Sequence, residues 1–249
     1  MAQAQTQLSM PQSVQDFIAS ASVFIIGGEE VRPTDRELIP TVNPATEEVI
    51  REVPQATAED VDRAVQAAVA AHQSGVWRTL NPSKRARILA KVADLIRRDA
   101  EQLAWLETLD NGKPLKHALG EVLQAAYAFQ YFAGWVDKPD GVTIPSRANR
   151  FTYSVREPVG VCGLIVPWNF PTMTAANKLA PALAFGNPVV LKPSEITPLS
   201  AVWLVRLLHE AGVPAGVVNL VQGVGPVTGQ ALVDHANVDK ISFTGSTKV

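Results

Sequence analysis

The chain is poor in residues that would cross-link it or draw it to a charged partner. Its 249 residues include one cysteine, Cys162, which excludes an internal disulfide and a cysteine-based metal cluster. With 22 Lys and Arg against 24 Asp and Glu, the net charge is −2, and no basic surface for nucleic acid or an anionic membrane is indicated. No apolar run approaches the roughly 18 residues that a membrane-spanning helix needs. Hydrophobic residues still make up 47% of the chain, so we expect a folded protein of one large or two modest domains.

A secretory signal is also lacking at the amino-terminal end. Residues 1–10 are rich in Gln and Ala and contain no basic segment followed by an apolar core. Because the segment is polar, we expect residues 1–20 to be disordered. Because no secretory signal is present, we expect the protein to be cytoplasmic.

Apolar residues recur at helical spacing through the first half of the chain and predict four helices. The first begins at Thr57, which stands at capping-box spacing from Asp60. The second begins at Asn81, a cap residue followed by proline. The other two helices are predicted over residues 101–109 and 116–136.

The second half of the chain alternates between strands and helices. Strands are predicted at residues 161–166, 188–191, 217–221 and 240–243, with helices at 172–184, 198–211 and 226–234 between them. This rhythm indicates right-handed βαβ units, and the apolar strands indicate a sheet covered on both faces. The predicted fold class is α/β, with a Rossmann-like parallel sheet and flanking helices. Residues 22–26, followed by two glycines, add an edge strand that turns into a hairpin.

Residues 139–158 have a different pattern. Phe151, Tyr153 and Val155 alternate with polar neighbours, which predicts a strand with one apolar face. Residues 141–145 precede this strand and pair with it across a turn in the predicted arrangement. Because two strands alone are marginal in water, the pair needs another surface to cover its apolar side.

Ligands of open parallel sheets bind at the carboxyl ends of the strands, so the loops that follow the strands are where we expect a site. In one of them, Gly223, Gly225 and Gly229 form a G-x-G-x-x-x-G run close to the dinucleotide-binding fingerprint. Tight turn geometry and close helix packing explain the same glycines equally well.

A neighbouring loop holds Lys192 and Glu195. A lysine and a carboxylate together suit ribose hydroxyls, because one donates hydrogen bonds and the other accepts them. The carboxylate would repel a 2′-phosphate, which favours NAD, with NADP as the alternative. The competing interpretation is a solvated surface pair.

Other chemistries have little support in the sequence. It contains no G-x-S-x-G elbow, no H-E-x-x-H helix and no Walker loop. Cys162 lies at the start of a predicted strand, away from the loops, and is expected to be a buried, inert thiol. The four histidines lack ligand spacing and are expected at the surface: His72, His117, His209 and His235. The residues alone therefore indicate a nucleotide-binding protein without a visible nucleophile or base.

Four ordered motifs resemble the NAD(P)-dependent aldehyde dehydrogenase superfamily. They are V-P-W-N-F-P at residues 166–171, L-K-P-S-E at 191–195, G-V-G-P at 223–226 and F-T-G-S-T at 243–247. Weaker agreements are F-I-I-G-G-E from residue 24, N-P-A-T from 43 and L-D-N-G-K-P from 109. The resemblance covers the chain from about Phe24 onward.

The resemblance implies roles for the loop residues. Asn169 would donate its side-chain amide to the oxyanion that forms when a thiolate attacks an aldehyde, with Trp168 and Phe170 shaping the site. Phe170 and Met173 indicate an apolar substrate entrance, and Lys178 is a lesser candidate for site electrostatics or a plain helix-surface lysine. The residues implied to bind the cofactor are Ile165, Val166, Pro167, Trp168, Lys192, Ser194, Glu195, Gly225, Pro226, Gly245 and Ser246.

The chain also departs from the family pattern. Family members are about twice as long, and their second half supplies the catalytic domain with its nucleophilic cysteine and water-activating glutamate. We therefore expect a truncated NAD(P)-binding domain at 21–138 and 159–249, an oligomerisation hairpin at 139–158, and no aldehyde oxidation by the chain alone. A homo-oligomer and a small aldehyde substrate are implied for the complete enzyme. The alternative is a genuine non-catalytic product that binds nucleotide or pairs with a full-length subunit.

Overall fold

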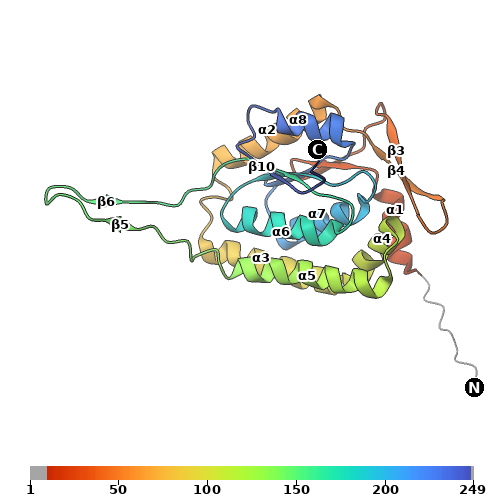
Figure 1. Cartoon of the computed structure of the whole chain (residues 1–249), viewed down its shortest axis with the longest axis horizontal. Helices are drawn as coiled ribbons and strands as arrows, with labels where there is room; N and C mark the ends of the chain where they lie inside the picture. Colours follow the sequence, from red (N-terminus) through yellow and green to blue (C-terminus); the bar gives the residue numbers. More distant parts are fainter. Residues whose placement is uncertain (1–9, 248–249) are drawn as a thin grey trace, which may run out of the picture.

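A six-stranded sheet forms the centre of the computed structural model, which describes residues 10–247 (Figure 1). The strand order is β10-β7-β8-β9-β1-β2. Four strands are parallel to one another and confirm the predicted α/β fold: β7 (Cys162–Ile165), β8 (Val189–Lys192), β9 (Val218–Leu220) and β10 (Lys240–Phe243). Every residue of β7, β8 and β9 is buried, as expected for parallel strands covered on both faces.

Helices cover both faces of this sheet (Figure 1). On one side lie α2 (Ala58–Ser74) and α8 (Gln230–Val233), and on the other lie α6 (Pro171–Ala184) and α7 (Leu199–Ala211). A further helical layer packs against α6 and α7 and consists of α3 (Pro82–Arg98), α4 (Ala100–Asn111) and α5 (Leu115–Ala133). Two clusters of buried apolar side chains result, one on each side of the sheet.

The predicted helix starts are confirmed in atomic detail. The Thr57 hydroxyl accepts from the Asp60 backbone N–H, while the Asp60 carboxylate accepts from the Thr57 N–H at 3.0 Å, which closes the capping box of α2. The Asn81 side chain accepts from Ser83 N–H at 2.9 Å at the start of α3. Gly112, with φ of 81°, ends α4 in the left-handed conformation.

Two predictions for the amino-terminal region are wrong. Residues 12–20 are not disordered but form α1 (Gln12–Ser20), because Val14 and Phe17 fall on one face and are buried, with Phe17 packed on Trp203 at 4.6 Å between ring centroids. Residues 1–9 lie outside the described part of the chain. The strand predicted at the sheet edge, β1 (Phe24–Ile26), pairs with β9 on one side and with β2 (Glu29–Val31) on the other, so β2 is the edge strand.

Two further strand pairs lie apart from the central sheet. An antiparallel pair that the sequence did not predict, β3 (Leu38–Val42) and β4 (Val49–Pro54), precedes α2. The predicted hairpin within residues 139–158 is confirmed as β5 (Thr143–Ile144) and β6 (Thr152–Tyr153), and it projects far from the body (Figure 1). Among the described residues, no helix is both long and apolar enough to cross a membrane.

Candidate functional site

A cleft of about 520 Å³ lies at the carboxyl ends of β7, β8 and β10. The strand order places it where a site is expected: the chain adds β8 and β9 on one side of β7 and then returns to place β10 on the other. It brings together every predicted cofactor residue and Asn169. The lining residues are Ile165, Val166, Pro167, Trp168, Asn169, Lys192, Ser194, Glu195, Gly225, Pro226, Phe243, Thr244, Gly245 and Ser246. Phe243 and Thr244 belong to a motif that the sequence revealed, but no role was predicted for them.

Lys192 is a buried member of the cleft. Its side chain is 3% exposed, its ammonium donates to the Pro193 carbonyl at 2.8 Å, and it lies 3.5 Å from the Glu195 carboxylate. Burial lowers the pKa of Lys192, although the charge of Glu195 opposes that shift. The interpretation as a solvated surface pair is therefore wrong for Lys192. An ammonium has three donors, so donors remain for a ligand in the cleft.

The glycine run adopts an unexpected local structure. Residues Gly225–Gly229 form a π-helical turn that leads into α8, instead of an α-helix from residue 226. Gly223, with φ of 150°, has no room for a side chain, because a Cβ there would lie 2.0 Å from the Thr228 hydroxyl. Backbone conformation and close packing thus account for Gly223, whereas Gly225 faces open space in the cleft wall.

The backbone of the Asn169 loop is held by residues from the end of α4. Asn111 donates its side-chain amide to the Trp168 carbonyl at 2.7 Å, and Lys113 donates to the Asn169 carbonyl at 2.9 Å. The Asn169 side chain is exposed on the cleft wall. The sequence revealed the L-D-N-G-K-P motif but gave no sign that Asn111 and Lys113 support this loop.

Lys113 is the centre of a largely buried ionic cluster. Its ammonium forms ion pairs with Glu107 at 3.2 Å and with Glu121, and it lies 5.0 Å from the centre of the Phe170 ring. Glu107 also accepts from the Thr172 backbone N–H at 3.0 Å at the start of α6. Burial raises the pKa of Glu107, while the Thr172 hydrogen bond and the Lys113 charge counteract that effect.

Several candidates lie outside the cleft. Lys178 donates to the Ser242 hydroxyl at 2.9 Å and lines a separate cavity of about 240 Å³ together with Cys162. Cys162 is 3% exposed, and burial raises the pKa of its thiol to about 11, which fits the predicted inert role. No histidine lines the cleft; His117 is exposed as predicted, whereas His72, His209 and His235 are half-buried. In residues 10–247 no cluster of three or more His, Cys, Asp or Glu side chains is arranged to hold a metal ion.

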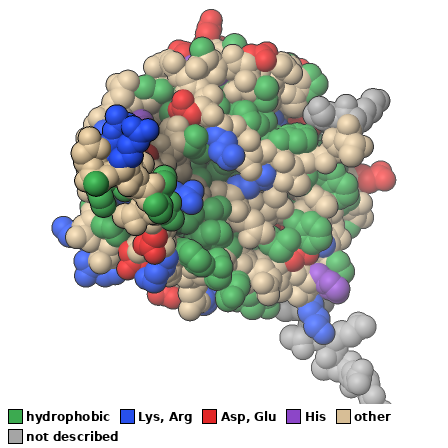
Figure 2. Space-filling view, turned by 60° about the vertical axis from the view of Figure 1, so that its left-hand side comes forward, with side chains coloured by type: hydrophobic (Ala, Val, Ile, Leu, Met, Phe, Trp, Pro, Cys, Tyr) green, Lys and Arg blue, Asp and Glu red, His purple; other side chains and the backbone are tan. Residues whose placement is uncertain are grey.

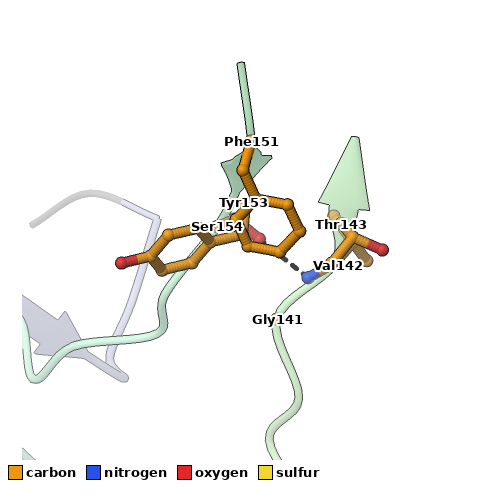
Figure 3. A pocket seen from close by; sticks show the side chains of 6 residues that line it. All are labelled: Gly141, Val142, Thr143, Phe151, Tyr153 and Ser154. Carbon is orange, nitrogen blue, oxygen red and sulfur yellow. Dashed lines mark hydrogen bonds between the residues drawn. The ribbon is translucent and has the colours of Figure 1, made fainter. Parts of the chain in front are cut away.

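The projecting hairpin carries exposed apolar side chains. Phe151 is 76% exposed and Tyr153 60% exposed, and their rings lie side by side with 5.6 Å between centroids (Figure 3). Val142 N–H donates to the Ser154 hydroxyl at 3.0 Å across the hairpin. Figure 2, which brings this side of the molecule forward, shows further apolar and basic side chains on the same face.

Comparison of the sequence with known proteins identifies similar proteins of one family. A family model described as "Aldehyde dehydrogenase family" matches residues 31–249. The chain is 52% identical over 228 residues to the mitochondrial aldehyde dehydrogenase of Mesocricetus auratus, which covers 91% of this chain and 46% of that protein. It is 48% identical over 245 residues to cytosolic aldehyde dehydrogenase 1 of Mus musculus, covering 98% and 49%.

A solved structure gives the same result. The NAD+ complex of an aldehyde dehydrogenase from Bacillus cereus superposes with a TM-score of 0.94 at 44% identity, covering 98% of this chain and 50% of that chain. The chain thus spans about half the length of the curated relatives it matches.

Proposed function

The chain belongs to the aldehyde dehydrogenase family, and on this premise we propose that it binds NAD+ in the cleft and serves the oxidation of an aldehyde to a carboxylic acid. The observation that carries this proposal is the gathering of the predicted cofactor residues around one cleft at the carboxyl ends of β7, β8 and β10. A homologous structure that contains NAD+ supports the choice of cofactor. In the proposed division of the chain, residues 21–138 and 159–249 bind the cofactor and residues 139–158 mediate assembly.

The residues present suit a dinucleotide. Lys192 has free donors, Glu195 is an acceptor, and Gly225 leaves the cleft wall open for close approach. We place the ribose hydroxyls against Lys192 and Glu195, the adenine along Gly225 and Pro226, and the pyrophosphate near Gly245 and Ser246. When bound, NAD+ supplies a hydride acceptor.

Glu195 provides the discrimination against NADP+. A 2′-phosphate on the adenosine ribose would lie next to the Glu195 carboxylate, and the two negative charges would repel each other. Titration calorimetry should therefore show tighter binding of NAD+ than of NADP+ to this chain. Glu195→Ala should narrow that difference, whereas Glu101→Ala, at an exposed position of α4, should preserve it. Equal affinities in the parent chain would contradict the assignment of Glu195.

Asn169 is the proposed oxyanion donor. In the proposed reaction a thiolate adds to the aldehyde carbonyl, hydride departs to NAD+, and water hydrolyses the resulting thioester. The Asn169 amide stabilises the charge that develops on the carbonyl oxygen. In an active enzyme that contains this chain, Asn169→Ala should lower turnover by about 10²–10³. Asn237→Ala, at an exposed turn outside the cleft lining, should leave turnover unchanged. Unchanged turnover in the Asn169 variant would remove this role.

These 249 residues do not supply the thiolate themselves. Their one cysteine, Cys162, is buried, outside the cleft, and held in the thiol form by its raised pKa. We therefore expect the 249-residue chain to produce no NADH from NAD+ and an aldehyde. NADH formation by the pure chain would show that another residue acts as the nucleophile.

The hairpin is the proposed assembly surface. Its exposed apolar side chains include Val142, Phe151, Tyr153 and Val155, and a second copy of the chain would cover them. The alternative partner is a longer subunit of the same family. Light scattering should show a smaller particle for a Phe151→Ser, Tyr153→Ser variant than for the parent.

A cytoplasmic location stays a prediction from the sequence, since relatives named mitochondrial and cytosolic both match.

A further inference from the structure

A buried glutamine reaches from the amino-terminal part of the chain to the wall of the cleft. Gln55, at the turn between β4 and α2, is 8% exposed. Its amide nitrogen donates to the Thr228 hydroxyl at 2.7 Å, across 173 residues of sequence, and to the Ala56 carbonyl at 3.0 Å. Its amide oxygen accepts from the Val224 backbone N–H at 3.0 Å. Both the nitrogen and the oxygen of the Gln55 amide are thus hydrogen-bonded to the segment that carries Gly225 and Pro226.

Thr228 completes the connection. It is fully buried, and its hydroxyl donates to the Ala56 carbonyl at 2.9 Å while it accepts from Gln55. The Gln55 amide passes over Gly223, where a Cβ would lie 2.5 Å from its nitrogen. The absence of a side chain at Gly223 is therefore what lets Gln55 reach Val224 and Thr228.

The segment held in this way is the π-helical turn Gly225–Gly229. π-Helical turns are rare and are frequently found at functional sites. Here the bonds from Gln55 fix the turn at its start, Val224, and near its end, Thr228. Gly225 and Pro226, between those two points, line the cleft.

We propose that Gln55 is a positioning residue for nucleotide binding. It holds the Gly225–Gly229 turn in the position from which Gly225 and Pro226 contact the adenosine part of the ligand. This inference rests on the proposed function of the cleft. Gln55 does not line the cleft itself, so its effect on binding passes through Val224 and Thr228.

The test is the affinity of the chain for NAD+ and for 5′-AMP, measured by calorimetry on the parent and on Gln55→Met. Methionine keeps the length of the side chain but removes its hydrogen bonds. We expect both ligands to bind about tenfold more weakly, equal to about 1.4 kcal/mol, because both include the adenosine part. Hydrogen exchange should show faster exchange of the amides in the Gly225–Gly229 turn.

Gln222→Met is the matched control. Gln222 is also a fully buried glutamine, but its amide donates to the Val23 carbonyl at 2.5 Å and to the Ala21 carbonyl at 3.4 Å, away from the turn. This variant should lose stability and keep its affinity within about twofold, well under the 1.4 kcal/mol of a tenfold change. A second pair of variants keeps the test valid if Gln55→Met fails to fold. Thr228→Val should weaken binding, and Thr228→Ser, which keeps the hydroxyl, should bind like the parent.

The outcomes separate the two claims. Weakened binding by Gln55→Met and Thr228→Val, with Gln222→Met unaffected, supports the positioning role. Parent-like affinity of Gln55→Met, or equal weakening by Gln222→Met, overturns it and leaves Gln55 as a structural residue. Failure of the parent chain to bind either ligand overturns the proposed function, and the inference with it.

Discussion

Replacing Lys113 by methionine should destabilise the chain by about 3–5 kcal/mol near neutral pH, the cost of leaving a buried charge without its partner. Lys113 lies 3.2 Å from the carboxylate of Glu107, whose side chain is fully buried, and it also pairs with Glu121. Methionine keeps most of the apolar stem of the lysine but removes the only cation within ion-pair distance of Glu107 among the described residues. The Asn169 carbonyl loses its donor in the same variant.

The magnitude has an upper limit because Glu107 can take up a proton. Burial already raises the pKa of Glu107, and loss of the Lys113 charge raises it further. Taking up that proton costs about 1.4 kcal/mol for each unit by which the solution pH exceeds the ordinary glutamate pKa of 4.5. A raised folded-state pKa means that the folded protein binds the proton more tightly than the unfolded chain. The deficit of the variant should therefore shrink as the pH falls from neutral toward the ordinary glutamate value of 4.5.

Urea unfolding followed by tryptophan fluorescence measures this cost. Lys138→Met is the control, since Lys138 and its partner Asp137 are 58% and 57% exposed, and exposed pairs contribute about 0–1 kcal/mol. Adding Glu107→Gln to Lys113→Met should recover most of the lost stability, because the fully buried carboxylate that Lys113 pairs with is then replaced by a neutral amide. A loss below about 1 kcal/mol for Lys113→Met, or no recovery in the double variant, would refute the reasoning.

Two further predictions follow from buried titratable groups. Because burial raises its pKa to about 11, Cys162 should resist Ellman's reagent in the folded chain and react once urea unfolds it; rapid labelling of the folded chain would contradict its assignment as an inert thiol. Burial lowers the pKa of His209, so the unfolded chain binds the proton first and the free energy of unfolding should fall as the pH drops below 6.5. His209→Gln should remove that part of the pH dependence in urea titrations, and an unchanged slope would assign it to other groups.

Much of the fold was readable from local patterns. The strands β7 to β10 fall within one residue of the predicted ends, and the caps at Thr57 and Asn81 are where the sequence placed them. Apolar runs, helix caps and glycine turns involve neighbours in sequence, so one sequence reveals them. The sequence does not predict the helix α1, because Val14 and Phe17 are its only buried residues and its other residues are mostly polar, a composition that favours disorder.

The sequence by itself determined the α/β class, the order of the strands along the chain and the loops that form the cleft, because parallel strands present their carboxyl ends on one edge. Only the tertiary structure decided what holds those loops in place. Gln55 meets Thr228 across 173 residues, and Lys113 meets the Asn169 carbonyl across 56. Such contacts leave no periodicity in the sequence. They arise because folding brings the end of α4 and the turn before α2 against the cleft, where buried polar groups must find partners.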